Sequence, residues 1–387
     1  GGGCTETGTP GAATQRSLRT EMREGTRLRD FDWTLLLIVL AICSLGIVEI
    51  YSATQSAPPS SKLAGLHWKQ FWWVLIGVAC MLVLSRIDYH TVLDQAPLLY
   101  LVGLAGLVLV LLIGESKYGS KSWIEIGGRT LQVSELVKLI IIVVLARFYS
   151  EVRTERLSLL DMGKAGVLVG LPVGLILLQP DFSTAVMFLP IAAMGAFLSG
   201  IQWKHMVAFA LIAALLLPVG WYFLKPYQKD RIHTFLRPEE NLRGAGYQTQ
   251  QAKIAVGSGG FWGKGIGKGT QNQGGFIPVR WSDFILAALA EETGFIGVLV
   301  TLLLYMFLLL RLVQNAQWAK DRSGMYIVMG VAAVLGVHVF VNVGMMIGYV
   351  PVTGIPLPLM SYGGSSTLFV FMALGLVMNV RLKRFVN

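Results

Sequence analysis

The stretch VRWSDFILAALAEETGFIGVLV, Val279–Val300, continues through TLLLYMFLLL without another charge before Arg311. Beyond its first residues, the apolar part of this stretch is longer than the roughly 20 residues that a helix needs to cross about 30 Å of hydrocarbon. Three carboxylates, those of Asp283, Glu291 and Glu292, lie at its head. Ionised groups are expensive in a membrane, so acids at such a position indicate a function or a specific partner. The stretch therefore predicts a membrane protein and raises the question of what these acids do.

The composition extends this prediction to the whole chain of 387 residues, which is 54% hydrophobic and 14% charged with a mean hydropathy of +0.61. These values exclude a soluble globular protein. Apolar runs of this length are helical, so we expect an all-α polytopic membrane protein with about ten transmembrane helices. The expected spans are 33–52, 68–86, 96–113, 133–150, 162–178, 183–199, 203–224, 283–311, 325–349 and 363–380.

The chain divides into a polar tail and one membrane domain. Residues 1–30 lack the apolar core of a cleavable signal peptide, and we expect a cytoplasmic tail that includes a fused remnant, because the sequence begins without Met. Residues 31–387 are expected to form a single transmembrane domain.

Ten spans place both termini on one side of the membrane. The Lys and Arg residues of the short connections favour the cytoplasm for that side. The long connection, 225–282, then faces outward. The net charge of +10 is explained largely by this bias, so nucleic acid is not expected as a partner.

Cysteine and histidine do not predict a metal cage. Cys4, Cys43 and Cys80 are widely spaced, and the five histidines lack HxxxH or HExxH spacing. These patterns indicate neither a disulfide framework nor a site of His and Cys ligands.

The long connection 225–282 is rich in glycine and cations. Glycine lets backbone N–H groups approach a ligand closely, and cations with such N–H groups suit phosphate oxygens. A flexible, solvated surface loop explains the composition equally well. Neither GxxxxGK[ST] nor GxGxxG is present, so ATP or dinucleotide binding is not predicted. The cations that could hold phosphate here are Arg231, Arg243, Lys264 and Lys268.

Two further positions carry charge within or beside expected spans. Glu135 and Lys138 are three residues apart, so they share a helix face and can pair. They are either a structural ion pair or a charged wall of a polar cavity. Asp181 lies in the Pro-containing turn between 162–178 and 183–199, where an acid typically caps the next helix.

Asp283 stands where the basic connection meets a helix. A helix cap, a cation ligand and a general base remain open as its role. Glu291 lies eight residues on, about 12 Å along a helix, which is too far for a retaining carboxylate pair at about 5 Å. Any chemistry at Asp283 is therefore that of a single carboxylate, with Glu291 and Glu292 structural or supporting.

Prolines and glycines at 351–364 interrupt the apolar pattern between the last two spans. Irregular backbone at a membrane boundary is tolerated where it lines a cavity or packs on protein. No GxSxG motif is present, so a serine hydrolase is not predicted.

Several of these segments together resemble one family. GYQTQQAKIAVGSGGFWGKGIGKGTQ, SDFILAALAEETGFIG and PVTGIPLPLMSYGGSS, with QPDFSTA and SELVKL, are similar to the SEDS proteins (shape, elongation, division, sporulation). The resemblance spans roughly residues 30–385 and is greater to the elongation branch than to the division branch. Four positions depart from the family pattern: Val279, Ser282, Leu286 and Val133. These departures concern the detailed placement of the substrate and leave every charged candidate residue in place.

The resemblance implies a peptidoglycan glycosyltransferase that polymerises lipid II, an undecaprenyl-diphosphate disaccharide-pentapeptide, for cell-wall elongation. It implies a class B penicillin-binding protein, a transpeptidase, as partner. The essential family acid corresponds to Asp283, the helical acid and base to Glu135 and Lys138, and a further acid to Asp181.

The family reaction converts an α-linked donor into a β-linked polymer, so a single inversion is needed. We hypothesise that Asp283 deprotonates the acceptor hydroxyl, while Lys138 and the cations of 225–282 neutralise the leaving diphosphate. No cofactor is certain; a divalent cation, magnesium or manganese, that bridges phosphate and Asp283 is left open. Membrane lipids are expected contacts. The alternatives are a lipid II flippase or transporter and a non-catalytic scaffold for a transpeptidase.

Overall fold

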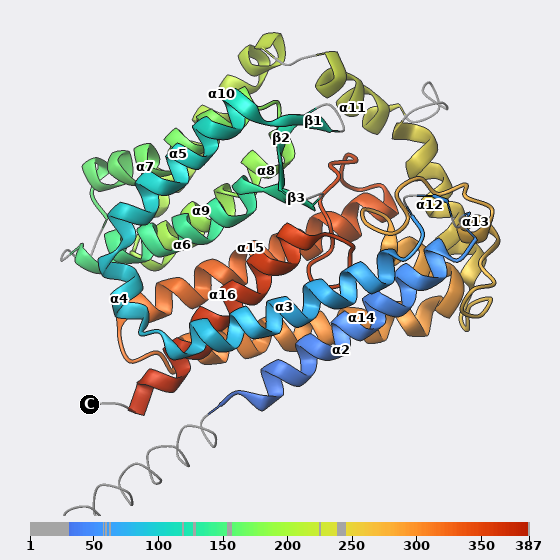
Figure 1. The fold of residues 1–387 in the computed structure, drawn as a ribbon. Helices are drawn as coiled ribbons and strands as arrows, with labels where there is room; N and C mark the ends of the chain where they lie inside the picture. Colours follow the sequence, from blue (N-terminus) through green and yellow to red (C-terminus); the bar gives the residue numbers. More distant parts are fainter. Residues whose placement is uncertain are drawn as a thin grey trace, which may run out of the picture.

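The computed structural model describes residues 31–56, 58, 60–61, 63–117, 120–126, 129–152, 157–223, 226–237 and 245–385. The described chain is a bundle of helices with one small sheet (Figure 1). The helices are α2 (Trp33–Thr54), α3 (Leu66–Arg86), α4 (Tyr89–Asp94), α5 (Ala96–Ile113), α6 (Val133–Glu151), α7 (Leu159–Leu178), α8 (Phe182–Val186), α9 (Leu189–Leu198), α10 (Trp203–Phe223), α11 (Pro226–Leu236), α12 (Ala245–Gly259), α13 (Thr270–Gln273), α14 (Ile285–Gln317), α15 (Arg322–Ile347), α16 (Gly364–Leu382) and the 3₁₀ turn η2 (Lys383–Phe385).

Where the structure describes them, the ten stretches expected to span the membrane are mainly helical, so the prediction of a mostly helical membrane protein is confirmed. The stretch 183–199 forms two short helices, α8 and α9. Among the described residues, seven helices are long and apolar enough to cross a membrane: α2, α3, α5, α7, α14, α15 and α16. The count of ten spans stays a prediction.

The last helix, α16, lies at the centre of the bundle. It packs along α3 and also contacts α6 and α15, while α14 packs between α2 and α15 (Figure 1). Most of the side chains of α16 are buried. Because a buried helix has neighbours on all sides, its apolar residues encircle it rather than forming one stripe.

A three-stranded antiparallel sheet was not expected. It consists of β1 (Glu115–Lys117), β2 (Ser120–Ile126) and β3 (Arg129–Gln132) in the order β1-β2-β3. In the sequence, a Gly-Gly dipeptide between two short runs that contain β-branched and aromatic residues is a hairpin signal. The sheet joins α5 to α6 and brings Gln132 beside α16, where its backbone N–H donates to Ser365 Oγ at 2.9 Å.

The long connection is more ordered than a solvated loop. Of its described residues, 226–237 and 245–282, most are in α11, α12 and α13, and α12 packs along α14. The side chains of Ala252 and Ala255 of α12 are fully buried. The reading of this segment as a flexible surface loop is therefore wrong for these residues, because alternate small residues of α12 let it approach α14 closely.

A polar cluster joins the ends of several helices. His90 of α4 forms hydrogen bonds with Asp88 at 3.0 Å and with Asp321 at 2.7 Å. Lys383 Nζ lies 2.7 Å from Asp88 Oδ2. These contacts tie α4 and the C-terminal turn to the start of α15.

Candidate functional site

Asp283 lies in a tight turn immediately before α14. Its backbone N–H donates to the carbonyl of Val279 at 3.1 Å, and Val279 has a positive φ of 50°. The N-cap residue of α14 is Phe284, not Asp283. The helix-cap role considered for Asp283 is therefore wrong, and its half-buried carboxylate is left to face the space beside the turn.

The segment between α15 and α16 holds this turn in place. Ser361 Oγ donates to the carbonyl of Ser282 at 2.6 Å, and the N–H of Tyr362 donates to the carbonyl of Trp281 at 3.0 Å. A Cβ on Gly354, whose φ is +74°, would lie 3.4 Å from Asp283 Oδ2. The irregular Pro/Gly backbone thus packs on protein and forms a wall against the carboxylate, as its composition predicted.

Asn342 of α15 connects the Asp283 turn to the segment between α15 and α16. Its Nδ2 donates to the carbonyl of Asp283 at 3.0 Å and to that of Ile355 at 2.9 Å. The side chain is fully buried, so both hydrogen bonds are shielded from water. One amide therefore sets the distance between the Asp283 turn and the 351–362 segment.

Arg231 is the predicted phosphate-binding cation that reaches this place. Its Nη1 lies 3.4 Å from the carbonyl of Thr353, which also accepts a hydrogen bond from Ser183 Oγ of α8. Burial raises the pKa of Asp283, and the hydrogen bond from Ser282 Oγ at 2.9 Å and the charge of Arg231 partly oppose that rise. A carboxylate with a raised pKa is a better proton acceptor than an exposed one.

Asp181 caps α8, as predicted. Its Oδ1 accepts from the N–H of Thr184 at 3.1 Å, and its Oδ2 accepts from Gln132 Nε2 at 2.9 Å. Ser183, which touches the carbonyl of Thr353, is two residues further on. Asp181 thus contributes to the site by orienting α8.

Glu135 and Lys138 form the predicted pair on α6, with Lys138 Nζ 2.9 Å from Glu135 Oε1. Lys138 is fully buried, lies 3.3 Å from His338 Nε2 and stands 4.7 Å from the ring centroid of Phe369. His338 Nδ1 is 2.8 Å from the carbonyl of its own helix at Val334, which places the proton on Nδ1 and leaves Nε2 to accept from the ammonium. His338 is one helical turn from Asn342, so the pair is linked through α15 to the Asp283 turn.

Glu291 and Glu292 face a different part of the molecule, the glycine-rich segment between α12 and α14. Glu291 accepts from Lys264 Nζ at 2.7 Å and from the backbone N–H groups of Gln271 and Asn272, both at 2.9 Å. The backbone N–H groups of the glycine-rich segment therefore bind the protein's own carboxylate.

Glu292 is held in the same way. It accepts from Ser52 Oγ at 2.6 Å, Asn272 Nδ2 at 2.7 Å and the N–H of Gly267 at 2.9 Å. Beyond it, α14 breaks at Gly294, which has φ 67° and ψ −162°. The two glutamates thus anchor the segment to α14, in the supporting role expected of them.

Of the two remaining predicted cations, the structure describes one. Lys268 is exposed within the glycine-rich segment, and Arg243 lies outside the described residues. In the described ranges, no three His, Cys, Asp or Glu side chains gather in a way that could hold a metal ion.

Comparison with known proteins assigns the chain. The family model described as "Cell cycle protein", which covers FtsW, RodA and SpoVE, matches residues 33–385. The chain belongs to this family.

Individual relatives agree with this assignment. The peptidoglycan glycosyltransferase MrdB of Escherichia coli K12 is 36% identical over 91% of this chain and 94% of its own length, and RodA of Treponema pallidum is 33% identical over 92% and 98%. A chain of a peptidoglycan synthase complex that coordinates polymerization and crosslinking superposes with a TM-score of 0.79 at 32% identity, covering 92% and 99% of the two chains. RodA of Thermus thermophilus superposes with a TM-score of 0.69 at 30% identity, covering 92% and 98%.

The FtsW/RodA/SpoVE chain is therefore an integral membrane protein, and its fold matches those of solved members. Sequence reasoning missed four residues of the candidate site: Ser282, Asn342, Gly354 and Ser361. The contacts of Asn342, Gly354 and Ser361 join positions that are far apart in the chain, so no local spacing pointed to them. Ser282 adjoins Asp283 and was considered only as a departure from the family pattern. The one available signal was the Pro/Gly segment itself, which was expected to line a cavity or pack on protein.

Proposed function

We propose that this protein is a peptidoglycan glycosyltransferase that polymerises lipid II during cell-wall elongation. The names of its relatives and its family support this proposal. The observation that carries the chemistry is Asp283: a half-buried carboxylate in a fixed turn, with a cation beside it and a raised pKa. The proposal places it on the outer face of the bacterial cytoplasmic membrane, with both termini in the cytoplasm.

The reaction is a single inverting displacement. Asp283 takes the proton of the acceptor GlcNAc 4-hydroxyl as that oxygen attacks C1 of the donor MurNAc. The new C1–O4 bond forms, the bond from C1 to the diphosphate oxygen breaks, and undecaprenyl diphosphate leaves with its bonding electrons. One base suffices, and the described carboxylates Glu291 and Glu292 are bound elsewhere.

The leaving diphosphate needs positive charge more than a proton. Arg231 is the cation that fits this role, since its charge acts on Asp283 and its guanidinium can bind phosphate oxygens with two hydrogen bonds. Lys264 is engaged by Glu291, and Lys138 by Glu135. Asp283 and Ser282 offer two oxygen donors, which suit magnesium or manganese only if substrate phosphates and water complete the coordination.

A transpeptidase of the class B penicillin-binding type is the partner we propose. One similar chain belongs to a peptidoglycan synthase complex that couples polymerization to crosslinking. A polymerase and a crosslinking enzyme in one complex would act on the same nascent strand.

Replacement of Asp283 by Asn tests the proposal. The amide keeps the shape of the side chain but cannot accept the proton, so we expect the rate of lipid II polymerisation in detergent to fall by roughly 10²–10⁴-fold. Asp230→Asn, on the exposed face of α11, is the matched control and should polymerise normally. Detergent separates enzyme from transporter, because polymer formation needs no second compartment.

Two results would oppose the proposal. Wild-type protein with its transpeptidase that forms no polymer would favour a flippase or a scaffold. An Asp283→Asn protein that binds its partner and polymerises at the wild-type rate would remove Asp283 from the chemistry.

A further inference from the structure

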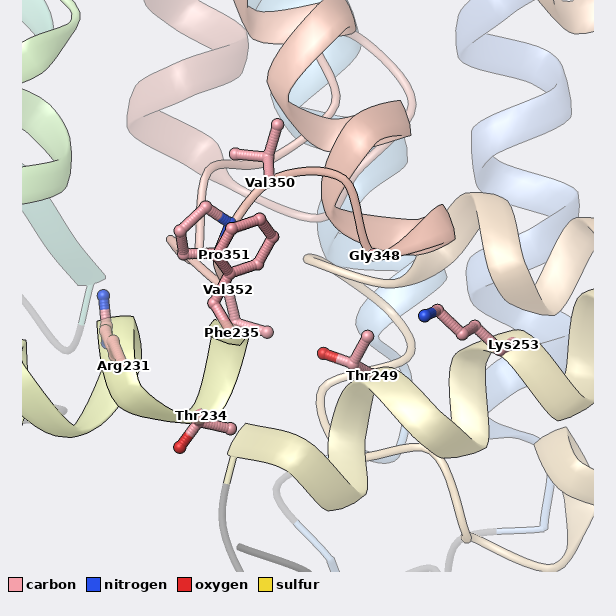
Figure 2. A pocket seen from close by; sticks show the side chains of 9 residues that line it. All are labelled: Arg231, Thr234, Phe235, Thr249, Lys253, Gly348, Val350, Pro351 and Val352. Atoms are coloured by element: carbon pink, nitrogen blue, oxygen red, sulfur yellow. The ribbon is translucent and has the colours of Figure 1, made fainter. Parts of the chain in front are cut away.

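A hollow opens beside the Asp283 turn, between α11, α12 and the segment that follows α15. The hollow is partly open, and the empty space in and directly above it amounts to about 340 Å³, open solvent included. Figure 2 shows the nine residues that line it. They are Arg231, Thr234, Phe235, Thr249, Lys253, Gly348, Val350, Pro351 and Val352.

The lining combines two kinds of surface. One is cationic: Arg231 stands on α11 at one side and Lys253 on α12 at the other, with Thr249 one turn before Lys253 (Figure 2). The other is apolar and consists of Phe235 with Val350–Val352. Two cations and a hydroxyl suit a group that carries several anionic oxygens, whereas the apolar wall suits hydrocarbon attached to it.

The end of the Lys253 side chain lies close to Gly348, the left-handed residue that ends α15. A Cβ added at Gly348 would lie 2.4 Å from Lys253 Cε and 2.5 Å from its Nζ. Glycine at this position therefore lets the exposed ammonium group lie against the backbone at the end of α15. The methyl group of Thr249 also faces Gly348. In Figure 2 the Thr249 hydroxyl points away from Lys253, toward the side of α11, and the Thr234 hydroxyl is turned away from both.

The segment that forms the apolar wall of the hollow continues along the chain to a contact with Asp283. Val352 is followed by Thr353, whose carbonyl contacts Arg231, and then by Gly354, which lies against the Asp283 carboxylate. Two residues of extended chain span about 7 Å. Val352, in the wall of the hollow, and Gly354, against the Asp283 carboxylate, are therefore at most about 7 Å apart along the chain.

We propose that this hollow binds the diphosphate of the lipid-linked donor, with Arg231, Thr249 and Lys253 holding its oxygens and the apolar wall covering the first part of its prenyl chain. The inference rests on the proposed function, which requires a diphosphate to leave from a carbon near Asp283. The acidic peptide of the same substrate shares the anionic chemistry but has no need of the apolar wall. Lys253 and Thr249 lie in the GYQTQQAKIAV part of the family motif but were not among the predicted site residues, and they are then substrate-binding residues.

Binding of farnesyl diphosphate and of undecaprenyl diphosphate to the purified full chain in detergent tests this assignment. Lys253→Gln, Thr249→Val and Arg231→Gln should each weaken binding, by roughly 10- to 100-fold for the two cations, since each removes a charge-assisted hydrogen bond. Lys69→Gln is the matched control: it removes an exposed lysine of α3, at the end of the bundle where Gln55 contacts Gly267. It should bind both diphosphates as the wild type does.

Competing ligands identify what the hollow recognises. We expect farnesyl monophosphate and inorganic diphosphate to compete weakly, because each lacks one part of the ligand, and an acidic stem pentapeptide not to compete. Competition by the pentapeptide, or wild-type affinity for both diphosphates in Lys253→Gln and Thr249→Val, would overturn the assignment.

Asp283→Asn separates this inference from the proposed function. It should bind farnesyl diphosphate at least as tightly as the wild type, because a negative charge is removed, yet form no polymer. If Lys253→Gln binds normally while Asp283→Asn is inactive, the hollow is wrongly assigned and the polymerase proposal stands. If wild-type protein binds farnesyl diphosphate but never polymerises lipid II, the polymerase proposal fails instead.

Discussion

Replacement of Lys138 by Met should destabilise the protein strongly. The side chain of Lys138 is 1% exposed and that of Glu135 is 8% exposed. Glu135 Oε2 has no hydrogen-bond partner in the described structure, so its ion pair with Lys138 is the main compensation for burying the carboxylate. Breaking a buried pair from one side typically costs 3–5 kcal/mol, because a charge is left without its partner. We expect the free energy of unfolding in detergent to fall by about 4 kcal/mol.

The double variant Glu135→Leu/Lys138→Met should recover most of this loss. Two apolar side chains of similar volume leave no charge behind, and such replacements are commonly neutral or stabilising. The coupling energy between the two positions should then be at least about 3 kcal/mol, because each single variant loses stability that the double variant keeps. Lys164→Met is the control, since Lys164 pairs with Asp161 at 3.8 Å with a side chain that is 58% exposed. Such surface pairs contribute about 0–1 kcal/mol.

Polymerisation by the double variant separates the two roles considered for this pair. The contact of Lys138 with His338 lies one turn from Asn342, which holds the Asp283 turn. Small displacements of a catalytic group can slow a reaction about 10²-fold. We therefore expect the double variant to be stable but at least tenfold slower. The ion-pair reasoning would be refuted by single variants that are as stable as the wild type. It would also be refuted if the double variant lost as much free energy of unfolding as the two single variants together. A stable double variant with the wild-type rate would refute the link to Asp283.

Three further substitutions test separate features. Gly294→Ala should lower the free energy of unfolding by about 3 kcal/mol, because φ 67° with ψ −162° is accessible essentially only to glycine. The control is Gly170→Ala, in open space on α7, which should be neutral or slightly stabilising. Equal effects of the two substitutions on the free energy of unfolding would contradict this reasoning. Ser282→Ala removes a hydrogen bond that lowers the pKa of Asp283, so the acidic limb of the pH–rate profile should move to higher pH; a shift to lower pH would exclude Asp283 as the titrating base. Burial lowers the pKa of His90, but the hydrogen bonds of His90 with two aspartates outweigh this effect, so the pKa is raised. The stabilisation that the charged His90 gives to the folded protein is therefore complete below the unfolded pKa of about 6.5. It is lost as pH rises through the folded pKa. His90→Asn should therefore destabilise the protein more at pH 6 than at pH 9, and an equal deficit at both would refute the charged interaction.

Local patterns predicted the parts of the fold that depend on neighbouring residues. The apolar runs predicted the helices, and the spacing of three residues predicted the ion pair of Glu135 and Lys138. The acid that follows a proline predicted the helix cap at Asp181. The ordered connection between α11 and α14 was not found, because glycine-rich sequence has weak propensity and its structure comes from packing on α14. The small sheet was missed for a similar reason: its strands are short and were overlooked among long apolar runs.

The three acids of the opening stretch differ in how completely their oxygens are used. Glu291 and Glu292 each accept several hydrogen bonds from the glycine-rich segment, so their oxygens are occupied by groups of the protein itself. The Asp283 carboxylate accepts a hydrogen bond from the hydroxyl of the neighbouring Ser282, while its backbone carbonyl is fixed by Asn342. A base must be rigid in position and still have a lone pair for the substrate. Among these three carboxylates, that combination is found at Asp283, and the hydrogen bonds that distinguish it come from residues 59 or more positions away.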